Sequence, residues 1–99
     1  MNNQNTQDQS WHHPGGKLLE LGPESCSDKE LLAILIGTGH KGKTALEIAD
    51  ELMQKHLSLY GLMDKNLAEL AEIKGLKAAK LTRIAAAYEI ARRLHTRLS

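Results

Sequence analysis

The chain has 99 residues, of which 41% are hydrophobic, with no Phe, a single Cys and a formal net charge of +1. This length is enough for one domain with a thin core. Cys26 cannot form an internal disulfide, and the sequence contains neither a signal peptide nor an apolar run of membrane-spanning length. We therefore expect a single cytoplasmic domain that does not enter the membrane.

The small net charge hides a strong segregation along the chain. Residues 1–72 carry six Lys/Arg and eleven Asp/Glu, whereas residues 73–99 carry seven Lys/Arg and one acid. The helix macrodipole accounts for arginines near a helix C-terminus, but it disfavours cations at a helix start. Four cations lie at the start of the last predicted helix: Lys74, Lys77, Lys80 and Arg83. Their position favours a polyanionic partner.

The first predicted elements precede the main helices. Residues 1–16 are polar and contain one large apolar group, Trp11, so we expect a disordered tail and a folded domain over 17–99. Residues 17–21 form a short apolar turn, which Gly22 and Pro23 end. Ser27 followed by Glu30 is a capping box, and it predicts a helix over 28–36.

Two further helices and a connector follow this first helix. Three glycines between residues 37 and 43 predict a loop. Thr44 with Glu47 repeats the capping-box pattern and opens a helix that ends near His56. Residues 59–63 read as a short connecting turn or helix.

The last part of the chain predicts a second pair of helices. Asn66 is a predicted N-cap for a helix that reaches Ile73, residues 74–77 break it, and a final helix runs from about 78 to 94 or beyond. No segment alternates with period two, so we predict no strand. Each half is a capped helix, a glycine-containing break and a second helix. We therefore expect an all-α fold, a small bundle of two helix-hairpin-helix units in tandem.

The second predicted hairpin is the best candidate for a binding site. Gly75 permits the tight turn that such a corner needs, and Ile73 and Leu76 anchor it to the core. The helix that follows presents free backbone N–H groups and the positive end of its dipole, which attract anions. The predicted phosphate-binding residues are Lys74, Gly75, Leu76, Lys77, Lys80 and Arg83. The alternative is an ordinary helix corner with solvated lysines.

The first predicted hairpin matches the phosphate-loop pattern G-x-x-x-x-G-K-T between Gly37 and Thr44. A nucleotide-hydrolysing enzyme also needs a preceding strand, a parallel sheet and an acid that holds Mg²⁺. The run before this loop begins with a capping box and has no partner strands, so we do not expect nucleotide hydrolysis. We assign the loop as a secondary contact with DNA phosphates through Gly39, Lys41, Gly42, Lys43 and Thr44.

Several of these segments together resemble the N-terminal domain of the RadC family. They are Lys17–Glu24 with its Leu-Gly-Pro-Glu, Ser27-Asp28 with Glu30–Leu35, Gly37-Thr38-Gly39 with Lys41–Lys43, and Ile73–Leu76. The resemblance covers about residues 17–94. It implies a helix-hairpin-helix domain associated with DNA repair, followed in such proteins by a JAB/MPN-type metalloprotease-like domain with a His-x-His and Asp zinc motif.

This zinc motif does not occur in the 99 residues, and the five histidines lack metal-ligand spacing with one another or with Cys26. We therefore expect no catalytic site, metal or cofactor in this chain. Two positions and one segment depart from the family pattern. Lys77 replaces the usual second glycine, Ala78 replaces a frequent proline, and residues 13–16 replace an Arg-Pro-Arg-Glu entry.

Two functions are compatible with these residues. The first is DNA-backbone binding without sequence specificity, centred on the second hairpin. The second is a module that binds a protein partner or positions the metalloprotease-like domain, which the acidic first 72 residues favour because they would repel DNA.

Overall fold

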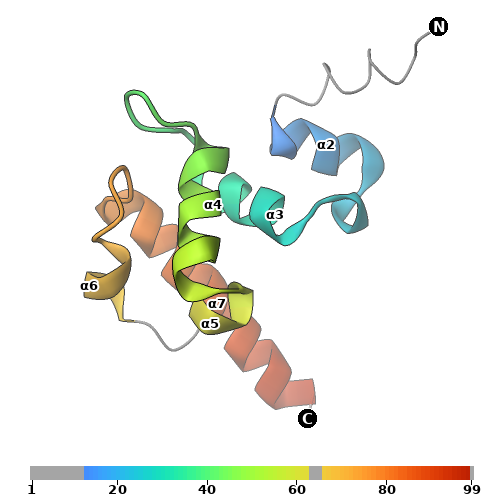
Figure 1. Cartoon of the computed structure of the whole chain (residues 1–99). Helices are drawn as coiled ribbons and strands as arrows, with labels where there is room; N and C mark the ends of the chain where they lie inside the picture. The colour runs from blue at the N-terminus through green and yellow to red at the C-terminus, as the bar shows by residue number, and fades with distance from the viewer. Residues whose placement is uncertain (1–12, 63–65, 99) are drawn as a thin grey trace, which may run out of the picture.

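The computed structural model describes residues 13–62 and 66–98, and its regular elements are all helices (Figure 1). They are α2 (Pro14–Leu21), the 3-10 helix η1 (Pro23–Ser25), α3 (Asp28–Ile36), α4 (Ala45–His56), α5 (Leu59–Leu62), α6 (Leu67–Leu70) and α7 (Ala78–Leu98). Within the described residues no strand is present. The predicted all-α fold is therefore confirmed.

Local hydrogen bonds fix where three of the helices begin. The Ser27 hydroxyl accepts a bond from the Glu30 amide at 3.2 Å, and the Glu30 carboxylate accepts one from the Ser27 amide at 2.9 Å. Thr44 and Glu47 form the same reciprocal pair at the start of α4. At the start of α6, the Asn66 side chain accepts a bond from the Glu69 amide. These contacts confirm all three predicted N-caps.

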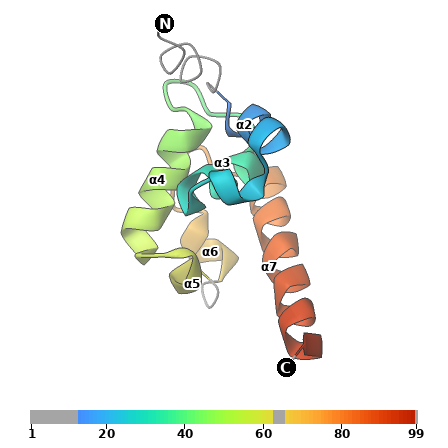
Figure 2. The ribbon, with the colours of Figure 1, turned by 90° about the vertical axis from the view of Figure 1, so that its right-hand side faces the viewer.

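The core lies between α3, α4 and α7, with α3 in the middle of the three (Figure 2). Its central side chains are nearly or completely buried: Leu32 and Ile36 from α3, Ile48 and Leu52 from α4, and Ile84 from α7. Ile73 and Leu76 join them from the segment before α7, each 2% exposed. The predicted anchoring of the second hairpin to the core through these two residues is confirmed.

Helix α2 differs from the prediction, because it is a helix from Pro14 rather than a turn from residue 17. Three residues of the predicted tail thus form its first turn, while residues 1–12 lie outside the described part. Proline suits the first helical position, since its φ is already helical and it has no N–H to satisfy. Lys17 also ties α2 to α3 by an ion pair with Glu30 at 3.1 Å. The Ser27 amide and then this ammonium hold the Glu30 pKa below its usual value, against the opposing effect of burial.

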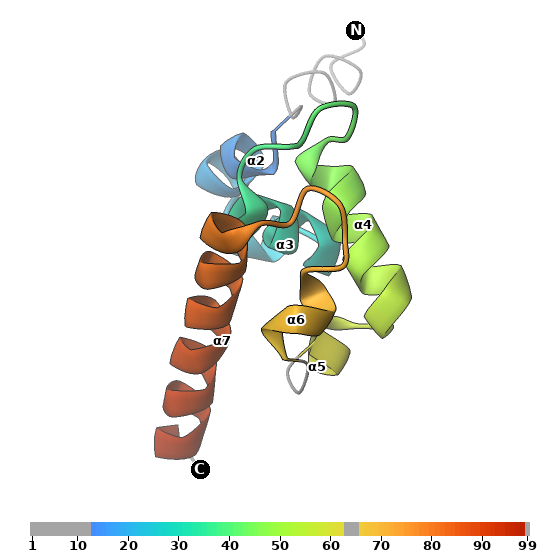
Figure 3. The same ribbon diagram turned by 90° about the vertical axis from the view of Figure 1, so that its left-hand side faces the viewer.

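Of the last two helices, α6 is shorter than predicted, whereas α7 agrees with the prediction of a helix to residue 94 or beyond. Helix α6 ends at Leu70 rather than Ile73, because the next residues tighten into turns in which the Ile73 amide bonds to the Leu70 carbonyl at 3.2 Å. Helix α7 continues to Leu98. Its last two turns project beyond the core (Figures 2 and 3), and Ile90 and Leu94 are 59% and 55% exposed.

Candidate nucleic-acid interface

Two loops lie side by side at the end of the molecule where α4 and α7 begin (Figure 3). The first loop is residues 37–44, between α3 and α4, and the second loop is residues 71–77, between α6 and α7. The Lys43 ammonium donates to the Lys74 carbonyl at 3.4 Å, which joins one loop to the other. The structure therefore brings together the two segments that the sequence analysis assigned to phosphate binding.

The first loop folds as a two-residue hairpin. The His40 amide donates to the Lys43 carbonyl at 2.8 Å, and the Lys43 amide donates to the His40 carbonyl at 2.7 Å. Gly42 has a φ of +80°, and a Cβ at this position would have open space around it. Lys41 and Gly42 are exposed at the tip, and their amides make no backbone hydrogen bond within the described residues.

The second loop turns tightly at Gly75, which is buried and has a φ of +95°. A Cβ at this position would lie 2.8 Å from the His40 Cβ and 2.9 Å from the Ile48 Cδ1. Glycine is therefore required here both by the backbone angle and by the close approach of the first loop. The Leu76 amide is used inside the turn, since it donates to the Ile73 carbonyl at 3.1 Å.

Helix α7 begins without the side-chain cap that α3, α4 and α6 have. Its N-cap position is Lys77, and a lysine side chain has only donors, so it cannot accept a bond from the first amides. The amides of Ala78, Ala79 and Lys80 have no hydrogen-bond partner among residues 13–62 and 66–98. The start of α7 therefore offers free N–H groups and the positive end of a 21-residue helix.

The four cations predicted around this site divide into two pairs. Lys74 and Lys77 are exposed, and in the described structure neither ammonium has a partner. Lys80 instead donates to the carbonyls of Gly39 and Gly75, at 3.2 and 3.3 Å. Arg83 donates to the last carbonyls of α3, those of Leu35 and Ile36, at 2.7 and 2.6 Å. The second pair thus binds the protein's own backbone.

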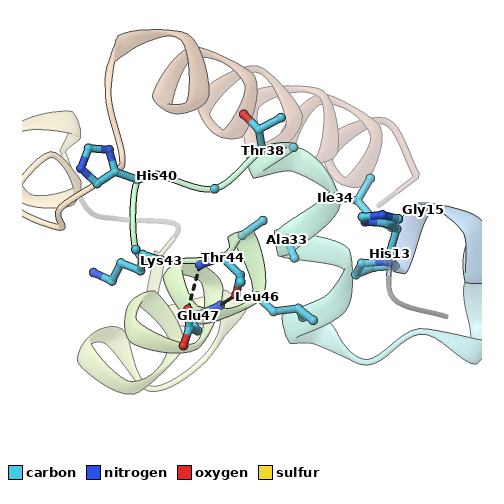
Figure 4. Close-up of a pocket in the computed structure, with 15 residues that line it drawn as sticks. His13, Gly15, Ala33, Ile34, Thr38, His40, Lys43, Thr44, Leu46 and Glu47 are labelled. Carbon is cyan, nitrogen blue, oxygen red and sulfur yellow. Dashed lines mark hydrogen bonds between the residues drawn. The ribbon is translucent and has the colours of Figure 1, made fainter. Parts of the chain in front are cut away.

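The phosphate-loop pattern lies beside a hollow of about 920 Å³ between α2 and the first loop (Figure 4). The segment before this loop is the helix α3, not a strand. The Thr44 amide donates to the Glu47 carboxylate at 2.8 Å, and Lys43 forms an ion pair with Glu51. The Glu47 carboxylate thus occupies the Thr44 amide, and the Glu51 carboxylate occupies the Lys43 ammonium. A nucleotide phosphate would need both of these donors, so this hollow does not suit one.

Two contacts of the interface have no signal in the sequence. The His40 side chain packs against Gly75, 35 positions further along the chain. Glu51 is exposed and forms an ion pair with Lys43. Neither helical nor strand periodicity predicts that the residues in these two contacts lie close together.

The described residues contain no group of three or more His, Cys, Asp or Glu side chains that could hold a metal ion. In the same part of the chain, no helix combines the length and the apolar character needed to cross a membrane.

Comparison with known proteins gives matches to one family. Residues 7–82 match the family model described as UPF0758 N-terminal. The chain is 46% identical over 80 residues to a UPF0758 protein of Methylibium petroleiphilum, covering 81% of this chain and 36% of that protein. It is 43% identical over 82 residues to a UPF0758 protein of Geobacillus thermodenitrificans, covering 83% and 36%.

These curated relatives are much longer than the matched region, and the chain spans little more than a third of their length. No solved structure matches the chain.

Proposed function

The chain belongs to the UPF0758 family of RadC-like proteins, and from this premise we propose that it is a helix-hairpin-helix module that binds the DNA backbone without sequence specificity. In this proposal the second loop and the first turn of α7 hold one phosphate group, and the tip of the first loop holds another. In this proposal the module carries no catalytic site of its own.

The observation that carries the proposal is the uncapped start of α7. Three free amides point away from the helix at a position where Lys77 occupies the N-cap and Lys74 lies nearby in the chain. An N-cap lysine gives up the stabilisation that Ser, Thr or Asn would supply. A phosphate would satisfy the amides and both ammonium groups together, because a helix N-terminus binds anions through its N–H groups and its dipole.

The first loop supports a second contact at its tip rather than along its whole length. Lys41 and the Gly42 amide are exposed, whereas Lys43 and Thr44 are used by Glu51 and Glu47. We therefore narrow the phosphate-binding set to Lys41, Gly42, Lys74, Lys77 and the amides of 78–80. Since Gly39 and Lys80 contribute to the contact between the loops, their role is to position this set.

The test is a titration with a labelled duplex at several salt concentrations. If two to four phosphates are neutralised, the affinity falls with salt with a log–log slope of about −2 to −4. Replacing both Lys74 and Lys77 by Gln should make that slope shallower by about 0.9, because both lysines serve the single phosphate that the second loop and the start of α7 hold. Affinity that ignores salt, or that survives this double replacement, would refute the proposal.

The matched control is Arg97→Gln. It removes an exposed positive charge from the same helix, but about 30 Å from its start, given a rise of 1.5 Å per residue. A shift of the slope by Arg97→Gln as large as that of a single loop lysine would mean that DNA responds to total charge and not to the site.

A second candidate function is to position a neighbouring domain or protein. The observation that favours it is the exposed apolar pair Ile90 and Leu94 on the projecting part of α7, in a chain that spans little more than a third of its relatives. Amide chemical-shift mapping with duplex DNA separates the two functions. Chemical-shift changes confined to residues 39–44 and 73–83 support DNA binding, whereas the absence of shift changes in these residues favours the positioning function.

A further inference from the structure

Lys80 lies between the two loops and is hydrogen-bonded to both. Its ammonium donates to the carbonyl of Gly39 in the first loop at 3.2 Å and to the carbonyl of Gly75 in the second loop at 3.3 Å. The two carbonyls belong to residues 41 and 5 positions away in the chain. An ammonium group has three N–H donors, so these bonds use two of them on the protein itself.

The other contacts between the loops are few. Lys43 donates to the Lys74 carbonyl at 3.4 Å, and the His40 side chain lies directly against Gly75. In the described residues no backbone hydrogen bond joins one loop to the other. Ile73 and Leu76 anchor the second loop in the core, and the direct contacts between the two loops are made by two lysine side chains and one close packing contact.

We infer that Lys80 is a positioning residue that holds the two loops in one fixed arrangement, so that they bind a single nucleic acid as a two-pronged unit. This inference rests on the proposed function, since it concerns how the same phosphate-binding residues act together. A Lys80 that turned towards a phosphate would leave both carbonyls without their donor. A prearranged pair of loops, by contrast, does not lose loop freedom on binding, and the second contact forms at a high effective concentration.

The inference predicts an interaction between residues that do not touch each other. With Lys80 in place, Lys41 on the first loop and Lys77 on the second contact the same DNA molecule. Lys80→Met keeps the apolar stem but removes the ammonium, so the first loop is held beside the second only by Lys43 and by the packing of His40 on Gly75, and it moves more freely. Lys41 then contributes little to binding, while Lys77, at the start of α7 itself, keeps its contribution.

The experiment is a double-mutant cycle, measured by titration of a labelled duplex at low salt. We expect Lys41→Gln to weaken binding about threefold or more in the wild-type background and by less than about 1.5-fold in the Lys80→Met background. As the matched control, Lys77→Gln should weaken binding by the same factor in both backgrounds. Equal effects of Lys41→Gln in the two backgrounds would make Lys80 an independent phosphate ligand and overturn the inference.

A measurement on the free protein separates this inference from the proposed function. Amide hydrogen exchange of His40 and Lys43, whose amides are hydrogen-bonded within the first loop, should become at least about tenfold faster in Lys80→Met, because the first loop loses a link to the second. Exchange that stays unchanged would overturn the positioning role whatever DNA does. If the wild-type protein does not bind the duplex, the proposed function is refuted, and so is the idea that the two loops bind one nucleic acid together. This holds even if hydrogen exchange shows that Lys80 links the loops.

Discussion

Gly75 lies where the two loops meet, and the loops can pack closely there because glycine has no side chain. Gly75→Ala would put a methyl group 2.8 Å from the His40 Cβ and force a non-glycine residue to a φ of +95°. Backbone strain of about 1–2 kcal/mol and overpacking of about 1–3 kcal/mol should together lower the free energy of unfolding by about 2–5 kcal/mol. Urea unfolding followed by circular dichroism measures the loss.

Gly42→Ala is the matched control, because Gly42 has a similar φ of +80° but open space around it. Its cost should be the backbone strain alone, about 1–2 kcal/mol. Equal losses for the two variants would mean that the first loop moves away from the second without cost, which would contradict the close packing of His40 on Gly75.

His56 is a buried polar residue that the fold does not satisfy. It ends α4 at 8% exposure, and its Nε2 has no hydrogen-bond partner in the described part of the chain. Burying such an atom removes it from water and costs free energy, and no hydrogen bond within the protein offsets this cost. Replacing His56 by Leu should therefore leave the free energy of unfolding unchanged or raise it by about 1 kcal/mol.

Tyr88→Phe provides the opposite case for comparison. The Tyr88 hydroxyl donates to the Leu59 carbonyl at 2.7 Å, so this variant removes a bond that is formed and should cost about 1 kcal/mol. Thermal or urea unfolding of both variants gives the comparison. A loss of more than about 1 kcal/mol in His56→Leu would show that the imidazole contributes packing or a bond that leucine cannot replace.

At the scale of single elements, the uncapped start of α7 predicts a conflict between stability and binding. Lys77→Ser supplies the acceptor that the first amides lack, so it should raise the free energy of unfolding by about 1 kcal/mol. The same change removes a cation and occupies a donor, so affinity for a duplex at low salt should fall. Lys77→Gln removes the charge without capping and is the control. If Lys77→Ser were no more stable than Lys77→Gln, the result would mean that the first amides of α7 already have a hydrogen-bond acceptor.

The helix starts were predictable because a capping box is a contact between residues three apart. Ser27 with Glu30 and Thr44 with Glu47 therefore gave the starts of α3 and α4 to the residue. The end of α6 was not predictable in this way. Ile73 fits the helical spacing of the apolar residues in α6. In the structure it is buried in the core as an anchor of the second loop, and the residues between Leu70 and Ile73 form tight turns instead of continuing the helix.

The candidate site was predictable as two segments but not as one surface. Glycine and lysine patterns located both loops, since these patterns are local. Apart from the Gly75 carbonyl, five residues from Lys80, the partners of Lys80 and Arg83 are carbonyls 41 to 48 residues away, and periodicity carries no information about such pairs. Basic charge at a helix start was therefore assigned to phosphate for all four cations, whereas two of them bind the backbone of the first loop and of α3.

At the scale of the whole molecule, α7 separates the basic loops from a second group of cations. Arg92 and Arg93 pair with Glu89, whose pKa their side-chain hydrogen bonds lower to about 2, so the carboxylate keeps its charge under physiological conditions. One of the three positive charges at the far end of the helix is thus locally offset. The segregation of charge along the sequence overstates the positive potential that DNA would meet there.

Deleting residues 92–99 tests whether this projecting end has a part in the fold or in DNA binding. Every described side chain from 92 to 97 is exposed, and the core ends with Ile84 and the half-buried Tyr88. The deletion should therefore change the free energy of unfolding by less than about 0.5 kcal/mol, as expected for exposed positions.

DNA affinity at 0.1 M salt should also stay within about twofold, because the lost charges lie beyond the screening length of about 10 Å. The loops at the start of α7 are at least about 20 Å away along the helix. Urea unfolding and the duplex titration measure the two quantities on the same truncated chain. A drop in stability would show that the end of α7 packs on the domain, and a drop in affinity alone would show that DNA follows the helix away from the loops.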